Sequence, residues 1–295
     1  MKNWHLTLCL ITTVFGGCGD TSEPTQPPTP SPAPVEIEDP LTFGVVPQFG
    51  TKHFAEVWEP LVRELEIATG LPIRLIPTPS IPAFEAGFSR GDYDFAYMNP
   101  YHYLCAKRDQ GYLPLIRDQS KKLKGILTVR SDSSIESIKE LNGEKIAFPA
   151  PNALGASLYM RALLTRNHQI DFVPVYVNSH DSVYLNVTTN EVLAGGGVKR
   201  TLTSQSAAIQ EKLRIIYETP GVAPHPIVHH PRVPETTVKK VMDAWLALSH
   251  ATDGRKLLEG IPMNDPGLAT DQDYQPLDEL GLDEFYIAPE PIREQ

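Results

Sequence analysis

The sequence predicts an α/β fold of mostly parallel sheets that helices cover on both faces. From Leu41 onward, short β-rich runs alternate with segments whose apolar residues recur at helical spacing. Glycine and proline fall at the borders of these segments, where helices end or begin. Because strands that alternate with helices pair in parallel beneath their crossover helices, this order indicates α/β sheets.

Each expected element follows from a local pattern. Apolar positions have helical spacing over residues 53–69, and Gly70 ends this helix. Ser133 and Glu136 have the spacing of a capping box, which predicts a helix ending at residues 142–143. The other helices are expected at residues 83–89, after Pro100, and at 155–166, 181–189 and 236–250. Strands are expected at residues 41–46, 73–76, 95–98, 125–129, 145–148, 172–177, 192–194, 213–217 and 227–229.

The first 18 residues are typical of an export signal. Lys2 is followed by an apolar run, residues 6–15, that is too short to span a bilayer. Phe15-Gly16-Gly17-Cys18 resembles a bacterial lipobox, in which the cysteine is lipidated, whereas an ordinary signal peptide with an incidental cysteine is the alternative. Residues 19–40 are proline-rich, so we expect a disordered linker that reaches on the order of 70 Å at about 3.1 Å per residue.

Composition and charge limit the class of protein. The net charge of −10 argues against a nucleic-acid binder, which needs basic patches, but allows a buried anion site made of neutral donors. Cys105 is the only cysteine beyond residue 18, so we expect no internal disulfide in the processed chain. No segment beyond residue 18 has eighteen consecutive apolar residues, so we expect no membrane span there.

Sequence motifs of catalysis are absent. The chain has no G-x-S-x-G, P-loop, H-E-x-x-H or C-x-x-C. Asp92, Asp94 and Asp181 are isolated carboxylates better explained as turn or cap residues, so we expect no enzyme and no cofactor. His225 and His229 share a strand face, but no Cys, Asp or Glu joins them at ligand spacing, so we expect no metal site.

Polar side chains gather where the expected strands end. In α/β sheets ligands bind at these carboxyl ends, near helix N-termini. The neutral donors found there are Gln48, Thr51, Thr78, Ser80, Tyr97, Asn99, Tyr101, His102, Asn152, Ser157, Asn178, Ser179 and His180. Such a set suits a compact oxyanion. The alternative is that they are helix caps and turn residues, which favour Ser, Thr and Asn.

Several motifs in order carry a family resemblance. They are FGVVPQ (43–48), GDYDFAYMNPYHYL (91–104), LKGILTV (123–129), LNGEKIAFPAPNALGAS (141–157), NSHDSVYLNVTTNEVLAGGGV (178–198) and TPGVAPHPIVHHPRVP (219–234). From about residue 41 to 282 the chain resembles the phosphate/phosphite/phosphonate-binding proteins of ABC importers. The resemblance implies a type II periplasmic binding protein with two α/β lobes, two crossovers and the ligand between them. Lobe 1 would comprise residues 41–128 and 222–295, and lobe 2 residues 129–221.

The resemblance also implies site residues. His180 matches a family histidine that donates to the ligand at the start of a second-lobe helix. Residues 150–157 match the family's phosphonate loop but lack its three consecutive hydroxyl residues, Ser-Thr-Ser. Backbone N–H groups, Asn152 and Ser157 remain there as donors to the ligand. We expect the ligand among Ser80, Tyr97, Asn99, Tyr101, His102, Asn152, Ser157, His180, Arg200 and His225.

Two departures bear on the ligand. Relatives that bind aminoalkylphosphonates use carboxylates to pair the ammonium group, and by spacing those positions hold Arg200 and His225. A cation there would repel an ammonium group. We therefore expect a plain oxyanion or a ligand with a second anionic group, which Arg200 suits through bidentate contact. A surface arginine at a helix start is the alternative for Arg200.

The sequence leaves two binding functions open. The first is an extracytoplasmic, lipid-anchored binding protein, monomeric, that passes an oxyanion to an ABC permease. The second is a sensor of the same fold that signals to a membrane kinase or cyclase, with an oxyanion or a metalloid such as arsenite as ligand. Cys105 would serve as the arsenite ligand in that case, and a buried small apolar residue is the alternative.

Overall fold

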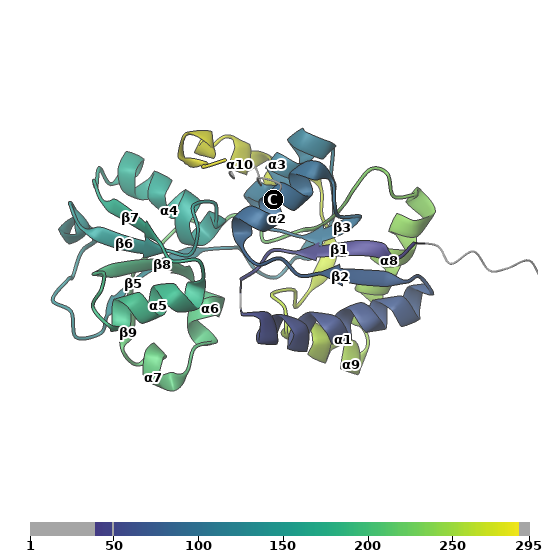
Figure 1. Cartoon of the computed structure of the whole chain (residues 1–295), viewed down its shortest axis with the longest axis horizontal. Helices are drawn as coiled ribbons and strands as arrows, with labels where there is room; N and C mark the ends of the chain where they lie inside the picture. The colour runs from purple at the N-terminus through teal and green to yellow at the C-terminus, as the bar shows by residue number, and fades with distance from the viewer. Residues whose placement is uncertain (1–38, 49, 289–295) are drawn as a thin grey trace, which may run out of the picture. The chain divides into compact units, whose positions relative to one another are not determined.

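A computed structural model describes residues 39–48 and 50–288, which contain two β-sheets flanked by helices (Figure 1). The strand order is β11-β4-β10-β3-β1-β2 in the first sheet and β7-β6-β8-β5-β9 in the second. Both sheets belong to one compact unit of the chain. The export signal, Cys18 and nearly all of the expected linker lie outside the described residues.

The first sheet combines the beginning and the end of the folded chain. Its strands are β1 (Leu41–Val45), β2 (Ile73–Ile76), β3 (Phe95–Tyr97), β4 (Leu113–Asp118), β10 (Ile227–His229) and β11 (Pro266–Leu268). Its helices are α1 (Thr51–Thr69), α2 (Ile81–Arg90), α3 (Pro100–Gln110), α8 (Glu235–Leu248), α9 (Thr252–Glu259), α10 (Asp271–Asp278) and the 3-10 helix η4 (Leu282–Phe285). Helices α1, α8 and α9 pack together, and α2 packs with α3 (Figure 1).

The second sheet is formed by the middle of the chain. Its strands are β5 (Gly125–Arg130), β6 (Lys145–Phe148), β7 (Val173–Tyr176), β8 (Ala194–Val198) and β9 (Leu213–Glu218). A helical run consists of η2 (Leu154–Leu158), α4 (Tyr159–Ala162) and η3 (Leu163–Asn167), and its first and last parts are π-helical. The other helices are η1 (Ile138–Leu141), α5 (His180–Thr188), α6 (Lys199–Thr203) and α7 (Ala207–Gln210). Helices α4 and α5 cover opposite faces of this sheet (Figure 1).

Two chain segments, residues 119–124 and 219–226, connect the sheets. They pair with each other through an antiparallel bridge, in which the Leu123 N–H donates to the Val222 carbonyl at 2.9 Å and the reverse bond measures 3.0 Å. The lobe division expected at residues 128 and 129 falls inside β5, which belongs wholly to the second sheet. We therefore propose these two segments as the borders between the lobes.

The strand directions differ from the expectation of mostly parallel sheets. Strand β1 pairs in parallel with β2 and β3, and β6 with β7 and β8. The remaining pairs are antiparallel. The reason is the connectivity: β10 enters the first sheet from the second one, between β3 and β4, and runs against both of them.

Two local predictions are also wrong. The capping box is formed by Ser137 and Glu140, not by Ser133 and Glu136, and it begins the 3-10 helix η1. The strand expected at 192–194 is β8, which extends through three glycines to Val198. Glycine has no side chain that signals a strand, so the pattern at these positions was uninformative. The elements that the sequence did not predict are β4, α6, α7, α9, β11, α10 and η4.

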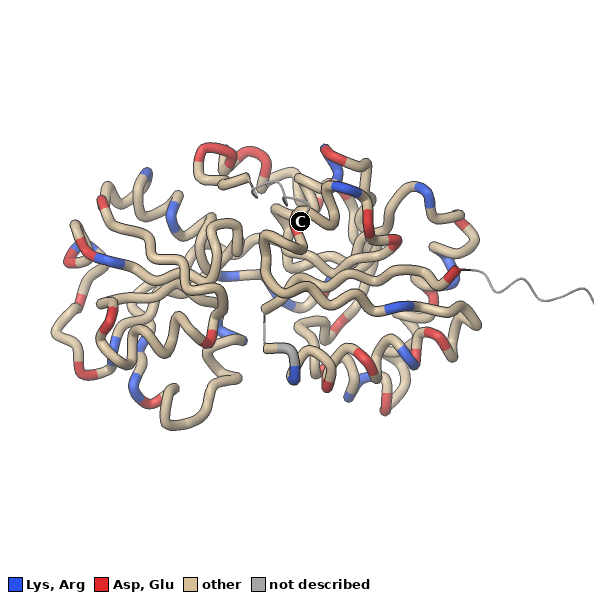
Figure 2. The backbone as a smooth tube through the Cα atoms, in the orientation of Figure 1, with Lys and Arg blue, Asp and Glu red and all other residues tan. Residues whose placement is uncertain are grey.

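An aromatic cluster fills the core between α1 and the first sheet. The Trp58 ring lies 5.8 Å from Phe43 and 5.1 Å from Tyr97, measured between ring centroids, and Trp245 of α8 completes the cluster. The apolar stripe predicted for this helix therefore faces the sheet. Charged residues of both signs follow the outer side of α1, whereas the strands are mostly uncharged (Figure 2).

The glycines of β8 allow helices to approach both faces of the strand closely. A Cβ on Gly195 would lie 2.5 Å from Val183 Cγ1 of α5, and one on Gly197 would overlap the Tyr184 hydroxyl. On the other face, a Cβ on Gly196 would overlap the Ala156 carbonyl oxygen. These distances are far below van der Waals contact, so β8 fixes how closely both helices sit.

We expect Gly196→Ala to destabilise the fold by about 1–3 kcal/mol, because the added methyl group overpacks a backbone contact. Thermal unfolding of the two purified proteins measures this as a drop of several degrees. Gly50→Ala is the matched control, since a Cβ there meets nothing within 4 Å. Equal melting temperatures for Gly196→Ala and the unmodified chain would contradict the close-approach argument.

Candidate functional site

Four helix N-termini meet at one small cavity, called the inner cavity here. Ile81 begins α2, Asn99 caps α3, Leu154 begins the helical run and His180 begins α5. The inner cavity is lined by Val46, Gln48, Ile81, Asn99, Leu123, Ala153, Leu154, Gly155, Ala156, His180, Val198 and His225. Its volume is ≈ 20 Å³, about the space of one water molecule.

The inner cavity offers hydrogen-bond donors and no carboxylate. Helix N-termini expose N–H groups without intrahelical partners and carry the positive end of the helix dipole. In the helical run, the Ser157 N–H donates to the Ala153 carbonyl at 2.7 Å, so the N–H groups of residues 154–156 precede the first such bond. None of the lining residues is Asp or Glu. This arrangement suits a compact anion.

His180 is held by a hydroxyl network. Its Nδ1 lies 3.2 Å from Thr201 Oγ1, which is 2.8 Å from the Tyr184 hydroxyl. His180 is 4% exposed, and burial lowers its pKa to about 4. The imidazole is therefore neutral at pH 7. When Thr201 donates to Nδ1, the proton of the ring is on Nε2, where it is available to an acceptor.

His225 is a second neutral histidine on the opposite side of the inner cavity. Its Nε2 lies 3.0 Å from Gln48 Nε2, and because an amide nitrogen donates, the histidine nitrogen accepts. Burial, with the nearby histidines His102 and His180, lowers the pKa of His225 to about 3. Its ring stacks on Tyr97 at 5.2 Å between centroids.

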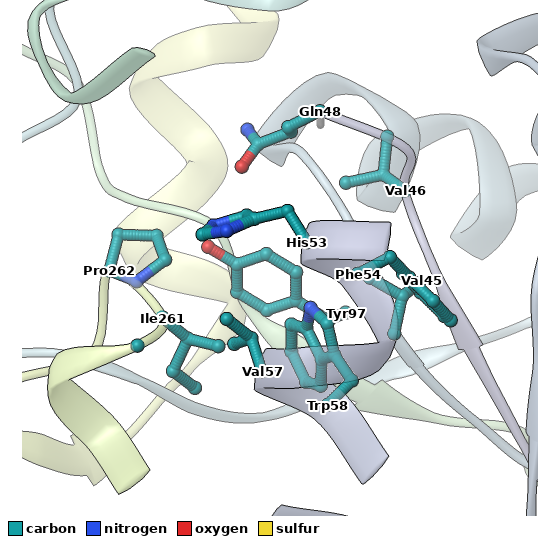
Figure 3. A pocket seen from close by; sticks show the side chains of 11 residues that line it. Val45, Val46, Gln48, His53, Phe54, Val57, Trp58, Tyr97, Ile261 and Pro262 are labelled. Atoms are coloured by element: carbon teal, nitrogen blue, oxygen red, sulfur yellow. The ribbon is translucent and has the colours of Figure 1, made fainter. Parts of the chain in front are cut away.

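Tyr97 separates this region from an apolar pocket beside α1. Figure 3 shows its ring near Val57 and Trp58, with its hydroxyl directed away from them toward the side of Pro262. The side chain is 1% exposed, and its hydroxyl has no hydrogen-bond partner in the part of the chain that the structure describes. Burial raises the pKa of Tyr97, so the hydroxyl stays protonated and is able to donate.

A second and larger cavity, the basic cavity, adjoins the inner one. It measures ≈ 570 Å³ and shares Gln48, Leu123, Val198 and His225 with the inner cavity. Its charged lining residues are Lys121, Lys122, Lys124, Lys199, Arg200 and Glu218. Tyr97 also lines it.

Arg200 reaches from α6 to the end of α9. Its Nη2 donates to the carbonyls of Glu259 at 3.2 Å and Gly260 at 2.5 Å, where the negative end of the α9 dipole lies. Its Nε is buried without a partner, and burial lowers the pKa of the guanidinium. Arg200 thus links the two sheets and also borders the basic cavity.

Three of the expected residues serve structural roles near α2 and α3. Ser80 caps α2, where its Oγ accepts from the Ala83 N–H at 3.3 Å. His102 is fully buried between Phe84 and Phe88, with Nε2 3.0 Å from Glu85 Oε1. The Tyr101 hydroxyl donates to Asp283 Oδ1 at 2.6 Å. Neither Tyr101 nor His102 is among the residues that line either cavity.

Asn152 and Ser157 also point elsewhere. The Asn152 side chain exchanges two hydrogen bonds with the backbone of Ile287, at 2.7 and 3.0 Å. Ser157 Oγ accepts from Arg161 Nε at 3.2 Å, and Ser157 is fully buried. These polar groups hold the C-terminal segment and the helical run, so neither side chain is part of the site. The backbone carbonyl of Asn152, in contrast to its side chain, contacts a residue of the inner cavity: Asn99 Nδ2 donates to it at 3.0 Å.

Cys105 does not favour a metalloid site. It is 1% exposed, and burial raises the pKa of its thiol to about 12, which disfavours the thiolate. It lies by Tyr101 in a cavity apart from His180. Over residues 39–48 and 50–288, no cluster of three or more His, Cys, Asp or Glu is arranged to hold a metal ion. In the same residues, no helix has the length and hydropathy to cross a membrane.

The sequence did not indicate the roles of Thr201 or the basic cavity. Thr201 follows β8, whose position was misjudged, and so its place beside His180 was missed. The basic cavity has a visible signal in Lys121-Lys122-Leu123-Lys124, but a run of lysines in a connecting segment is usually solvated surface.

Comparison with known proteins identifies the family. A family model described as "ABC transporter, phosphonate, periplasmic substrate-binding protein" matches residues 43–274. The phosphonates-binding periplasmic protein of Escherichia coli is 22% identical over 261 residues, which cover 84% of this chain and 77% of that protein. The phosphate-import protein PhnD of Mycolicibacterium smegmatis is 19% identical over 210 residues, 62% of this chain and 64% of the relative, less than two thirds of its length.

A solved structure with the same fold is PhnD1 from Prochlorococcus marinus in complex with methylphosphonate. It has a TM-score of 0.75 and 18% sequence identity, and the alignment covers 82% of this chain and 96% of the other. This likeness confirms the predicted two-lobed α/β fold, and the family model confirms the resemblance carried by the motifs. The chain therefore belongs to the family of periplasmic substrate-binding proteins of phosphonate ABC transporters.

Proposed function

We propose that this chain captures a phosphorus oxyanion (phosphate, phosphite or a phosphonate) outside the cytoplasm and delivers it to the permease of an ABC importer. The observation that carries the proposal is the convergence of four helix N-termini and a neutral histidine on a cavity without carboxylates. Backbone N–H groups at helix N-termini bind phosphate-like groups without a net positive charge. The membership of the family and the names of its relatives support the same ligand class.

Within this proposal, His180 is the side-chain donor to the oxyanion. In the bound form proposed here, the Thr201 hydroxyl donates to Nδ1 of His180, 3.2 Å away, instead of to the Val198 carbonyl, and the ring proton is then on Nε2. The N–H groups of residues 154–156 supply further donors from the second sheet. Asn99 Nδ2 already donates to the Asn152 carbonyl, so the second hydrogen of this amide is the donor from the first sheet. Thr201 is a positioning residue because it acts only through the imidazole.

Ligand entry requires movement between the two lobes. The inner cavity holds about one water, which is less than a phosphonate group needs. The two connecting segments carry the Leu123–Val222 bridge and are the places where a hinge rotation would occur. We propose that opening at these segments admits the oxyanion and that closure brings both sets of donors onto it.

We also propose that the chain is anchored outside the cytoplasm through a lipid on Cys18. The lipobox-like residues 15–18 and the proline-rich residues 19–40 support this, because a long tether lets an anchored domain reach a permease. We expect the protein to act as a monomer and without a catalytic step.

A binding experiment tests the site. Phosphate, phosphite and methylphosphonate are titrated against residues 19–295 by calorimetry, which measures the Kd of each. In thermal unfolding, a ligand at 100 times its Kd should stabilise the fold by about 2.7 kcal/mol.

His180→Ala should weaken the affinity by roughly 10- to 100-fold, since it removes one hydrogen bond to a charged group. Thr201→Val should weaken it several-fold. His250→Ala is the control, because His250 is exposed and far from both cavities. Unchanged affinity in His180→Ala would refute the site.

The buried histidines predict a pH dependence of stability. Both folded pKa values lie below the unfolded value of about 6.5. As the pH falls below this value, the unfolded chain therefore binds more protons than the folded chain. Stability is therefore full above about pH 7 and decreases as the pH falls from about 6.5 through the folded pKa values of about 4 and 3, by several kcal/mol for the two residues together. Urea denaturation across this range measures the slope. His180→Gln and His225→Gln should each flatten it, and a slope equal to that of the unmodified chain would contradict the assignment.

The anchor is tested in the expressing bacterium. The full-length chain should be found in the membrane fraction and partition into detergent, because acyl chains contribute about 0.8 kcal/mol per buried CH₂. Cys18→Ser should release it into the soluble extracytoplasmic fraction, with Cys105→Ser as the control that stays in the membrane. If the full-length protein is found in the soluble fraction, the lipid anchor is refuted and residues 1–18 act as an ordinary export signal.

A further inference from the structure

The basic cavity is a concentration of positive charge in an acidic chain. Five cationic residues line it, and Glu218 is its only carboxylate. Glu218 Oε2 already lies 3.5 Å from Lys124 Nζ, so this carboxylate is paired. The chain as a whole carries a net charge of −10, which makes the positive lining a local feature and not a consequence of composition.

Two residues that line the cavity carry buried donors without a hydrogen-bond partner in residues 39–48 and 50–288. The Tyr97 hydroxyl is fully buried without a partner, and so is Arg200 Nε. A buried polar group without a partner destabilises a fold unless something else satisfies it. Both groups donate, and both border the same cavity, so the missing partner is an acceptor.

The basic cavity continues the inner cavity instead of forming a separate site. Gln48, Val198 and His225 line both of them. A molecule with its phosphorus oxyanion at His180 would therefore extend past His225 into the positive cavity. An ammonium group on that end would meet Lys199 and Arg200 without a free carboxylate to pair with.

We propose, on the basis of the oxyanion function above, that the ligand carries a second anionic group on a short linker and that the basic cavity binds this group. The chemical class is a phosphonocarboxylate. Tyr97 donates to the carboxylate, Arg200 Nε is a second donor, and the lysines at residues 121, 122 and 199 attract it electrostatically.

Three ligands of matched length test the proposal. They are 3-phosphonopropionate, propylphosphonate and 2-aminoethylphosphonate. In each, two CH₂ groups separate the phosphorus from the terminal group, which is a carboxylate, a methyl group or an ammonium group, respectively. Calorimetry on residues 19–295 at low salt should give the tightest binding for 3-phosphonopropionate, by about tenfold over propylphosphonate, and the weakest for 2-aminoethylphosphonate.

Two variants assign this preference to the cavity. The triple variant Lys121→Gln, Lys122→Gln and Lys199→Gln should remove most of the tenfold preference while propylphosphonate keeps its affinity. Tyr97→Phe should reduce it by a smaller factor. Lys240→Gln is the control, because Lys240 is an exposed lysine of α8 outside both cavities.

The outcomes separate the two proposals. If propylphosphonate or methylphosphonate binds and depends on His180, but 3-phosphonopropionate binds no tighter, the oxyanion function stands and the second subsite is refuted. If the control variant loses the preference as much as the triple variant, the preference comes from net charge and the subsite is also refuted. If no phosphorus oxyanion binds at all, the oxyanion function fails and this inference fails with it.

Discussion

The close approach of two helices to strand β8 is the constraint on which the site depends. Gly196 allows the first turn of the helical run to lie on the strand, with the Ala156 carbonyl where a Cβ would be. Gly195 and Gly197 allow the same for α5, whose N-terminus holds His180. A side chain at any of these three glycines would move a helix outward and separate the donors that now line one cavity. Packing of backbone against backbone therefore determines the electrostatics of the inner cavity.

The proposed anion site lies in a chain that is acidic overall. The inner cavity uses dipoles and neutral hydrogen-bond donors, and the net charge of the chain matters little there because such contacts act over short distances. Burial keeps His180 and His225 neutral, which avoids the cost of an unpaired buried charge. Full positive charges appear only in the adjoining basic cavity, where the lysines remain exposed to solvent.

Contacts between residues of the two sheets restrain any opening motion. Arg200 bonds to carbonyls at the end of α9, and Asn99 bonds to the Asn152 carbonyl. The C-terminal segment forms a further link, because Arg161 Nη2 donates to the Phe285 carbonyl at 2.7 Å while Tyr101 of α3 bonds to Asp283. These polar contacts accompany a continuous cluster of buried apolar residues, which joins Tyr101 of α3 to Leu154 and Tyr159 of the helical run. A bound anion that adds hydrogen bonds to both lobes would favour the closed form further.

The sequence by itself determined the alternation of strands and helices, the start of α5 at His180 and the family, because local periodicity and ordered motifs carry that information. The tertiary structure decided which polar residues meet. Asn152 and Ser157 follow a strand end just as Asn99 does, yet their side chains bond to the C-terminal segment and to Arg161. It also brought Thr201 to His180, and Lys199 to the same cavity as the lysines of residues 121–124. Spacing along the chain places a residue near a strand end, but the direction of its side chain depends on neighbours that are distant in sequence, and only packing fixes those.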